Sequence, residues 1–177
     1  MAIYLTLWRT IHGAQSSAPF PGTQKSWTAL SNDSSSDMIA RQTLHLSLNP
    51  DKIANGTGYN VADARTPSTW SEKWPALCSY FDLNGTGPAA DPPEMRKFIK
   101  DNMDTWERLE REHGLQTGHA DSKRTFPGFE YFLMTQFDFD RQYDMEKTYA
   151  TGFNEERDTL QAWGPVFDRM RKAKIIP

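Results

Sequence analysis

The sequence predicts a mainly α-helical domain with a few short β-strands, of the α+β class. Apolar residues recur at helical spacing in several segments, and most of these begin at a residue that can cap a helix. The candidate strands between them are too few and too short to form a stable sheet alone. The chain has 177 residues, which is enough for one domain over residues 1–177 and tight for two.

The first half of the chain is expected to hold three helices and two strands. The first helix is apolar on nearly all sides, which is typical of a buried helix. Ser34 to Ser36 can cap the second helix, and Thr66 followed by Pro67 can begin the third. The helices are expected over residues 2–13, 37–48 and 67–81, and the strands over residues 26–30 and 58–62.

The second half is expected to hold a loop and further helices. Asp91 to Glu94 has the spacing of a capping box with proline inside it, so a helix begins there. Gly114 ends the amphipathic segment that follows. Asn154 is expected to cap the last helix, whose acidic first turn and basic last turn match the helix dipole. The loop is expected over residues 84–90, the amphipathic segment over 101–112 and the last helix over 155–173.

Composition and charge exclude several classes of function. The net charge is −3 and the isoelectric point about 5.8, with no basic stripe, so we expect no nucleic-acid partner. No run of eighteen apolar residues predicts a membrane span. The single cysteine, Cys78, has no partner for an internal disulfide and lies among apolar residues at helical spacing. We expect a buried thiol in a reducing compartment, the cytoplasm.

Common cofactor and metal motifs are absent from the sequence. There is no Gly-x-Gly-x-x-Gly turn, no phosphate loop and no Gly-x-Ser-x-Gly elbow. The four histidines are far apart and lack metal-ligand spacing. We therefore expect no bound cofactor and no metal.

The most unusual stretch runs over residues 126–153. It contains six phenylalanines and three tyrosines, which fits either an aromatic core or the wall of an apolar pocket. Asp138 and Asp140 flank Phe139 and could form an acid–base pair only if their environments separated their pKa values. We favour a structural role, in which they pair with Arg141 or cap a helix near Asp144.

An ordered set of short motifs runs through nearly the whole chain. The motifs are Phe20-Pro21-Gly22-Thr23 with Trp27, Ser36-Asp37-Met38-Ile39-Ala40, Asn49-Pro50, Tyr59-Asn60-Val61-Ala62-Asp63, Thr69-Trp70 to Trp74, and Lys172-Ala173-Lys174-Ile175-Ile176-Pro177. Together they resemble the C-terminal half of progesterone 5β-reductase and iridoid synthase-like enzymes, which are extended short-chain dehydrogenases. Phe137-Asp138-Phe139-Asp140-Arg141-Gln142 resembles the fungal branch.

This resemblance implies a stand-alone substrate lobe of an extended short-chain dehydrogenase. In the family, a Rossmann half comes first and carries the glycine-rich NADPH loop, the catalytic tyrosine and the lysine, and no residue here matches them. Reductase activity is therefore not expected. The family's substrates are flat, hydrophobic carbonyl compounds such as steroids and terpenoid enals. The positions that match its substrate-facing residues are Tyr4, Trp8, Gly152 and Phe153.

One hypothesis is a cofactor-independent enzyme of fungal secondary metabolism. An aromatic pocket would hold a hydrophobic terpenoid or polyketide enone or polyene in a reactive shape for cyclisation, Diels–Alder-type cycloaddition or isomerisation. The candidate donors and base are Tyr131, Arg141, Tyr143, Tyr149 and His119. The candidate walls are Phe129, Phe132, Met134, Phe137 and Phe153. For each of these residues an ordinary structural role is the alternative.

The other hypothesis is a non-catalytic binding module, or one piece of a split NADPH-dependent enone reductase. In the second case, the short strands would complete the sheet of a separate Rossmann partner. For the chain on its own we expect a homodimer, because the missing Rossmann layer would leave a face of the lobe and its strand edges exposed.

Overall fold

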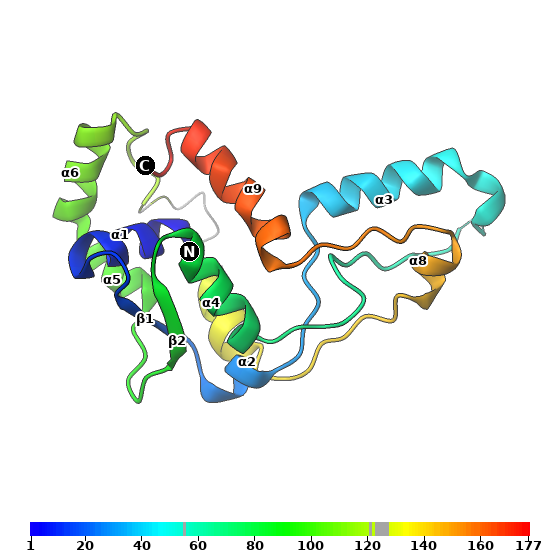
Figure 1. The fold of residues 1–177 in the computed structure, drawn as a ribbon, viewed down its shortest axis with the longest axis horizontal. Helices are drawn as coiled ribbons and strands as arrows, with labels where there is room; N and C mark the ends of the chain where they lie inside the picture. Colours follow the sequence, from blue (N-terminus) through cyan, green and yellow to red (C-terminus); the bar gives the residue numbers. More distant parts are fainter. Residues whose placement is uncertain (55, 121, 123–127) are drawn as a thin grey trace.

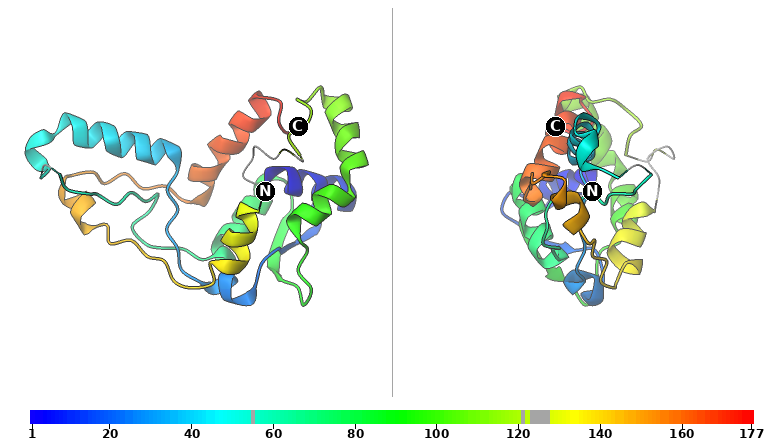
Figure 2. Two further views of the ribbon diagram at one scale, coloured as in Figure 1. Left: turned by 180° about the vertical axis from the view of Figure 1, so that it is seen from behind. Right: turned by 90° about the vertical axis from the view of Figure 1, so that its right-hand side faces the viewer.

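The structure is a computed structural model that describes residues 1–54, 56–120, 122 and 128–177. It consists of a lobe and an arm that extends away from it (Figures 1 and 2). The lobe contains α1 (Ala2–His12), β1 (Ser17–Phe20), α2 (Gln24–Thr28), α4 (Trp70–Tyr80), β2 (Asn84–Pro88), α5 (Met95–Asp101), α6 (Met103–His113), α7 (Phe129–Tyr131), the π-helical turn η2 (Phe132–Gln136) and α9 (Thr159–Lys172). The arm contains α3 (Ser36–Leu48), the short turn η1 (Pro50–Lys52) and α8 (Glu146–Ala150).

The predicted class, mainly helical with short strands, is confirmed, but both predicted strands are wrong. Residues 26–30 fall largely in helix α2, which Thr23 and Ser26 cap reciprocally. Residues 58–62 form no strand. The strands of the described residues are β1 and β2, which pair in parallel from Ser17 opposite Asn84 to Phe20 opposite Pro88.

Strand β2 lies in the stretch that was expected to be a loop because of its glycines and proline. One of those glycines has a packing role, since a Cβ on Gly85 would lie 2.7 Å from the Cα of Pro75 in α4. The missing side chain lets α4 lie directly on the strand pair. Trp74 of α4 then donates from its indole nitrogen to the carbonyl of Ala18 in β1, at 2.8 Å.

Two helices begin later than the sequence predicted, because the residues before them form hydrogen bonds with other segments of the chain. Helix α4 follows Thr69 rather than Thr66, since Ser68 exchanges backbone hydrogen bonds with Ser31. Helix α9 is capped by Asp158 rather than Asn154. Just before that cap, the Arg157 amide donates to the carbonyl of Asp63 at 2.6 Å.

The lobe and the arm have separate apolar cores. Large rings dominate the core of the lobe, including Tyr4, Phe20, Trp74, Trp106 and Phe167. The arm has a small cluster of its own, which does not join the core of the lobe: Met38, Ala62, Met145 and Phe153. No helix in the described part of the chain is both long and apolar enough to cross a membrane.

Cys78 is fully buried in the core of the lobe, as predicted, and burial raises the pKa of its thiol to about 12. The unfolded chain loses this proton near pH 9. The stabilisation that comes from keeping the thiol neutral is therefore complete below about pH 9 and is lost as the pH rises towards 12. We expect the native chain to resist a thiol reagent at neutral pH and the denatured chain to react at once.

The absorbance of the chromophore that the thiol reagent releases measures the rate of labelling of Cys78. In a second measurement, the stability of Cys78→Ala should fall less steeply than that of the wild-type chain between about pH 9 and pH 12. Rapid, complete labelling of the native chain would contradict the buried position.

Candidate functional site

An apolar groove of about 390 Å³ opens on the lobe. It lies between the residues that lead into α5 and the turn formed by α7 and η2. Proline, aromatic and methionine side chains form most of its wall, namely Pro21, Pro92, Pro93, Met95, Tyr131, Phe132 and Met134. Tyr131 and Phe132 are 54% and 52% exposed. Two large rings left half exposed beside an apolar groove are typical of a ligand-binding surface.

The backbone of η2 holds these rings in place. The Met134 carbonyl accepts hydrogen bonds from the Thr23 amide, at 3.2 Å, and from the Ser26 hydroxyl. Gly22 lies so close that a Cβ there would be 2.3 Å from the Met134 oxygen. Single π-helical turns of this kind occur frequently at functional sites. Here the turn fixes the floor of the groove while its rings remain accessible.

A smaller hollow of about 250 Å³ adjoins the groove and shares Met95, Arg96 and Glu130 with it. It adds His119 and Lys100 to apolar residues from α1, α5 and α9. His119 Nε2 lies 3.1 Å from Gln116 Oε1. Because an amide oxygen only accepts, Nε2 is the donor in this contact. The site is thus apolar along the groove and polar at the shared end.

A hydrogen bond from Gln136, in the turn η2, orients the hydroxyl of Tyr131. Gln136 donates from Nε2 to the Tyr131 oxygen at 3.1 Å. Since that oxygen is already an acceptor, the proton of the hydroxyl is available for another acceptor. Donating groups aligned in this way polarise one another. A carbonyl bound in the groove would be such an acceptor.

Four of the predicted site residues therefore gather at one place: Tyr131, Phe132 and Met134 in the groove, and His119 in the adjoining hollow. Phe129 begins α7, but its side chain, like Phe126, lies outside the described residues. The prolines of the groove and Glu130 were not predicted. The Pro92-Pro93 pair was interpreted only as a helix start, although two rigid rings before a helix also make a wall.

Arg141 and Phe137 lie together beyond the groove. The guanidinium carbon of Arg141 is 4.4 Å from the Phe137 ring centroid, and its Nε finds no partner within the described residues. Burial lowers the pKa of Arg141, and Asp33 partly offsets this. The predicted pairing of Asp138 and Asp140 with Arg141 is not found, since both carboxylates have other partners. Asp138 lies 4.0 Å from the Lys25 ammonium, and Asp140 accepts the amide of Leu30 at 2.9 Å.

Tyr143 and Tyr149 lie on the arm, in a separate hollow of about 430 Å³ beside α8. The Arg65 guanidinium carbon is 4.0 Å from the Tyr149 ring centroid. Burial, and then the charge of Glu156, raises the pKa of Tyr149. The structure does not bring these two tyrosines to the groove.

The four positions predicted from the family are also distributed. Phe153 is buried in the arm, 5.5 Å from the His45 ring, directly after Gly152. Tyr4 is fully buried in the lobe, and its hydroxyl has no partner among the described residues. Trp8 packs 5.6 Å from Tyr4 and donates to the Ser17 carbonyl. None of the four lines the groove or its adjoining hollow.

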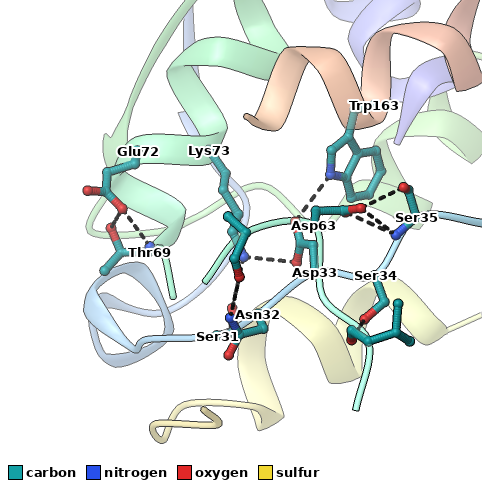
Figure 3. Close-up of polar contacts among 12 residues, drawn as sticks. Ser31, Asn32, Asp33, Ser34, Ser35, Asp63, Thr69, Glu72, Lys73 and Trp163 are labelled. Carbon is teal, nitrogen blue, oxygen red and sulfur yellow. Dashed lines mark hydrogen bonds and ion pairs between the residues drawn. The ribbon is translucent and has the colours of Figure 1, made fainter. Parts of the chain in front are cut away.

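A polar network that sequence reasoning missed joins the lobe to the arm (Figure 3). The Lys73 ammonium, on a side chain only 1% exposed, lies 2.9 Å from both Ser31 Oγ and Asp33 Oδ1. Trp163 of α9 donates to the other Asp33 oxygen at 3.2 Å. Nearby, Asp63 accepts from the amide and hydroxyl of Ser35, the N-cap of α3. The sequence feature that could have indicated this network is Lys73 itself, because a charged residue on the apolar face of a helix needs a buried partner.

Among the described residues, one segment can be compared with a dinucleotide-binding turn. It consists of strand β1, the turn at Gly22 and helix α2. The turn carries one glycine, and α2 has five residues. The amides of Thr23 and Ser26 are already bonded to each other's side chains. A pyrophosphate is bound by free amides at the N-terminus of a helix, so these occupied amides do not fit NADPH. Among the described residues, no three His, Cys, Asp or Glu side chains group as metal ligands do.

The chain belongs to the family of PRISE-like Rossmann-fold domains, whose model matches residues 1–177. The short chain dehydrogenase ausT of Aspergillus calidoustus is 32% identical, over 100% of this chain and 43% of the relative. The short chain dehydrogenase sirQ of Leptosphaeria maculans is 27% identical, over 90% and 40%. The (S)-8-oxocitronellyl enol synthase CYC2 of Camptotheca acuminata is 26% identical, over 89% and 40%.

These matches confirm the family predicted from the motifs. They also show that the chain spans less than half the length of these relatives.

Lys73→Met should lower the free energy of unfolding by about 2–3 kcal/mol, because it leaves the Asp33 carboxylate and Ser31 without their buried partner. This predicted loss of stability is smaller than the loss expected on breaking a fully buried ion pair, since the Asp33 side chain is partly exposed. Urea unfolding followed by tryptophan fluorescence measures it. Lys147→Met, at an exposed position on α8, is the control and should change stability little. Equal stability of the two variants would contradict the role of Lys73.

Proposed function

We propose that the chain binds a hydrophobic enone or polyene in the groove. We further propose that it promotes cyclisation, Diels–Alder-type cycloaddition or isomerisation of that compound without a cofactor. The observation that carries the proposal is the groove, whose volume of about 390 Å³ suits a terpenoid- or polyketide-sized ligand. Its rigid floor would hold a flexible chain in one shape, which removes part of the entropic barrier. These reactions rearrange bonds within one molecule and need no hydride.

Polar groups of the groove and of the adjoining hollow would supply the remaining chemistry. The Tyr131 hydroxyl would donate to the substrate carbonyl and stabilise negative charge that develops there. For an isomerisation, His119 Nδ1 would take a proton from carbon next to the double-bond system and return it to the other end. The proton count is unchanged, and no group is lost. The negative charge of Glu130, which borders both hollows, would favour the imidazolium formed in between.

The relatives support this choice of substrate class. The relatives from Camptotheca acuminata and Nepeta cataria are (S)-8-oxocitronellyl enol synthases, and the relative from Aspergillus calidoustus is a short chain dehydrogenase. We propose by analogy a carbonyl compound of fungal secondary metabolism, converted in the cytoplasm.

The second candidate is one piece of a split NADPH-dependent enone reductase, or a binding module without catalysis. The specific observation in its favour is length, since the chain covers 43% of the relative ausT. Incubating the chain with a linear terpenoid enal without NADPH, and identifying the product by NMR, separates the candidates. Conversion only with NADPH and a Rossmann partner would favour the second.

Phe132→Ala should weaken binding of a steroid enone or terpenoid enal about tenfold, because the ring would no longer cover apolar ligand surface. Calorimetric titration measures the dissociation constant. Phe139→Ala is the matched control, since Phe139 is similarly exposed but lies outside the groove. Equal loss in both variants, or in neither, would remove the groove as the binding site.

Tyr131→Phe should lower kcat by tenfold to about a hundredfold and leave KM nearly unchanged, because the hydroxyl donates most strongly to the charged transition state. Steady-state kinetics with the converted substrate provide the test. Tyr143→Phe, at an exposed tyrosine of the arm, should keep full activity. A loss confined to KM would reduce Tyr131 to a binding contact.

A further inference from the structure

We propose that the hollow beside the groove binds the carboxylate of an acidic substrate, whose apolar chain lies in the groove. This inference rests on the proposed function, because it assigns a chemical class to the compound that the groove would bind. The two cavities adjoin, since Met95, Arg96 and Glu130 line both. The groove has a volume of about 390 Å³ and the hollow about 250 Å³. One linear molecule would therefore extend from the first into the second.

Basic side chains outnumber acidic ones in the wall of the hollow. Arg96 and Lys100 line it together with one carboxylate, that of Glu130. His119 adds a group that can gain a proton near neutral pH. This balance contrasts with the whole chain, whose net charge is −3. Among the lining residues, more charges would attract an anion than would repel it.

Other hollows of the described residues have the opposite balance. The hollow on the arm combines Arg65 with the carboxylates of Asp144 and Glu146. A hollow beside α6 likewise has two glutamates to one arginine. The preference for an anion is therefore a local property of the hollow that adjoins the groove, rather than a general property of the surface.

Lys100 is the basic side chain that is available to hold the anion. It is exposed, and it forms no ion pair within the described part of the chain. Its neighbour on α5, Lys97, is instead paired with Asp101. An ammonium without a carboxylate from its own chain can accept one from a ligand. Hydrogen bonds between two charged groups are also stronger than those between neutral groups.

The start of α1 adds to the positive potential of the hollow. Ala2 and Ile3 line the hollow, and the helix has 11 residues. No described side chain caps its first turn, which also contains no acidic residue. The first amides of a helix have no partner inside it, and the helix dipole places partial positive charge there. This helix end supports an anion that Lys100 binds and does not form a site on its own.

The available charge indicates a carboxylate rather than a phosphate. Lys100 supplies one unpaired positive charge, which matches a group with a single negative charge. A phosphate monoester carries nearly two negative charges at neutral pH. The second charge would lie unpaired in a hollow that Glu130 also borders. A hydrophobic carboxylic acid is thus the substrate class that fits both cavities.

Calorimetric titration with farnesoic acid and with its methyl ester tests the inference, because the two probes share their apolar chain and differ in the charge of the head group. The acid should bind the wild-type chain about tenfold more tightly than the ester. Lys100→Met should remove most of this difference by weakening the acid alone. Lys97→Met is the matched control, since Lys97 lies on the same helix but lines neither cavity, and it should keep the difference. Circular dichroism confirms that each variant folds.

The Phe132→Ala variant separates this inference from the proposed function. It should weaken acid and ester equally, because Phe132 covers the chain that both probes share. Equal affinity of acid and ester in the wild-type chain, with both weakened by Phe132→Ala, would overturn the carboxylate site and leave the groove in place. Equal losses in Lys100→Met and Lys97→Met would also overturn the carboxylate site. If neither probe binds, the groove and this inference are overturned together.

Discussion

The relation between lobe and arm depends on one buried ammonium, that of Lys73. A charge removed from water costs several kcal/mol unless its partners stay in place, and here they are Ser31 and Asp33. Asp33 in turn holds the indole of Trp163 in α9. The chain leaves the lobe for the arm just after Asp33, so α4 and α9 together fix where the arm begins (Figure 3). The arm is consequently a fixed projection with a small core of its own.

Backbone contacts, rather than burial of rings, fix the groove in a similar way. The Met134 carbonyl accepts hydrogen bonds from Thr23 and Ser26 at the start of α2, and the backbone of Gly22 packs closely against the same carbonyl. These contacts hold the turn η2 in place. Tyr131 and Phe132 therefore need no packing of their own to stay in position. Their apolar surface remains available, and a ligand that covers them gains the hydrophobic free energy that the fold has left unused.

What the sequence could predict depended on local spacing. The end of α6 at Gly114, the helix α3 and the burial of Cys78 follow from caps and periodicity, and all three are confirmed. The pairing of β1 with β2 could not be predicted from local spacing. A glycine such as Gly85 usually indicates a turn, and its actual role depends on the close contact with Pro75 in α4, which is distant in the sequence. Likewise, Tyr131 and Tyr149 share one aromatic stretch, but the stretch passes from lobe to arm, which no spacing reveals.

This division of the aromatic stretch also separates the arm from the groove. All the residues that line the groove belong to the lobe. Free-energy changes at sites without shared partners usually add, so substitutions within the arm should leave ligand binding in the groove nearly unchanged. The network at Lys73 is the exception, because it joins the two parts. A perturbation there would alter the position of α4 and the start of α3 together, and it would connect the stability of the arm with that of the lobe.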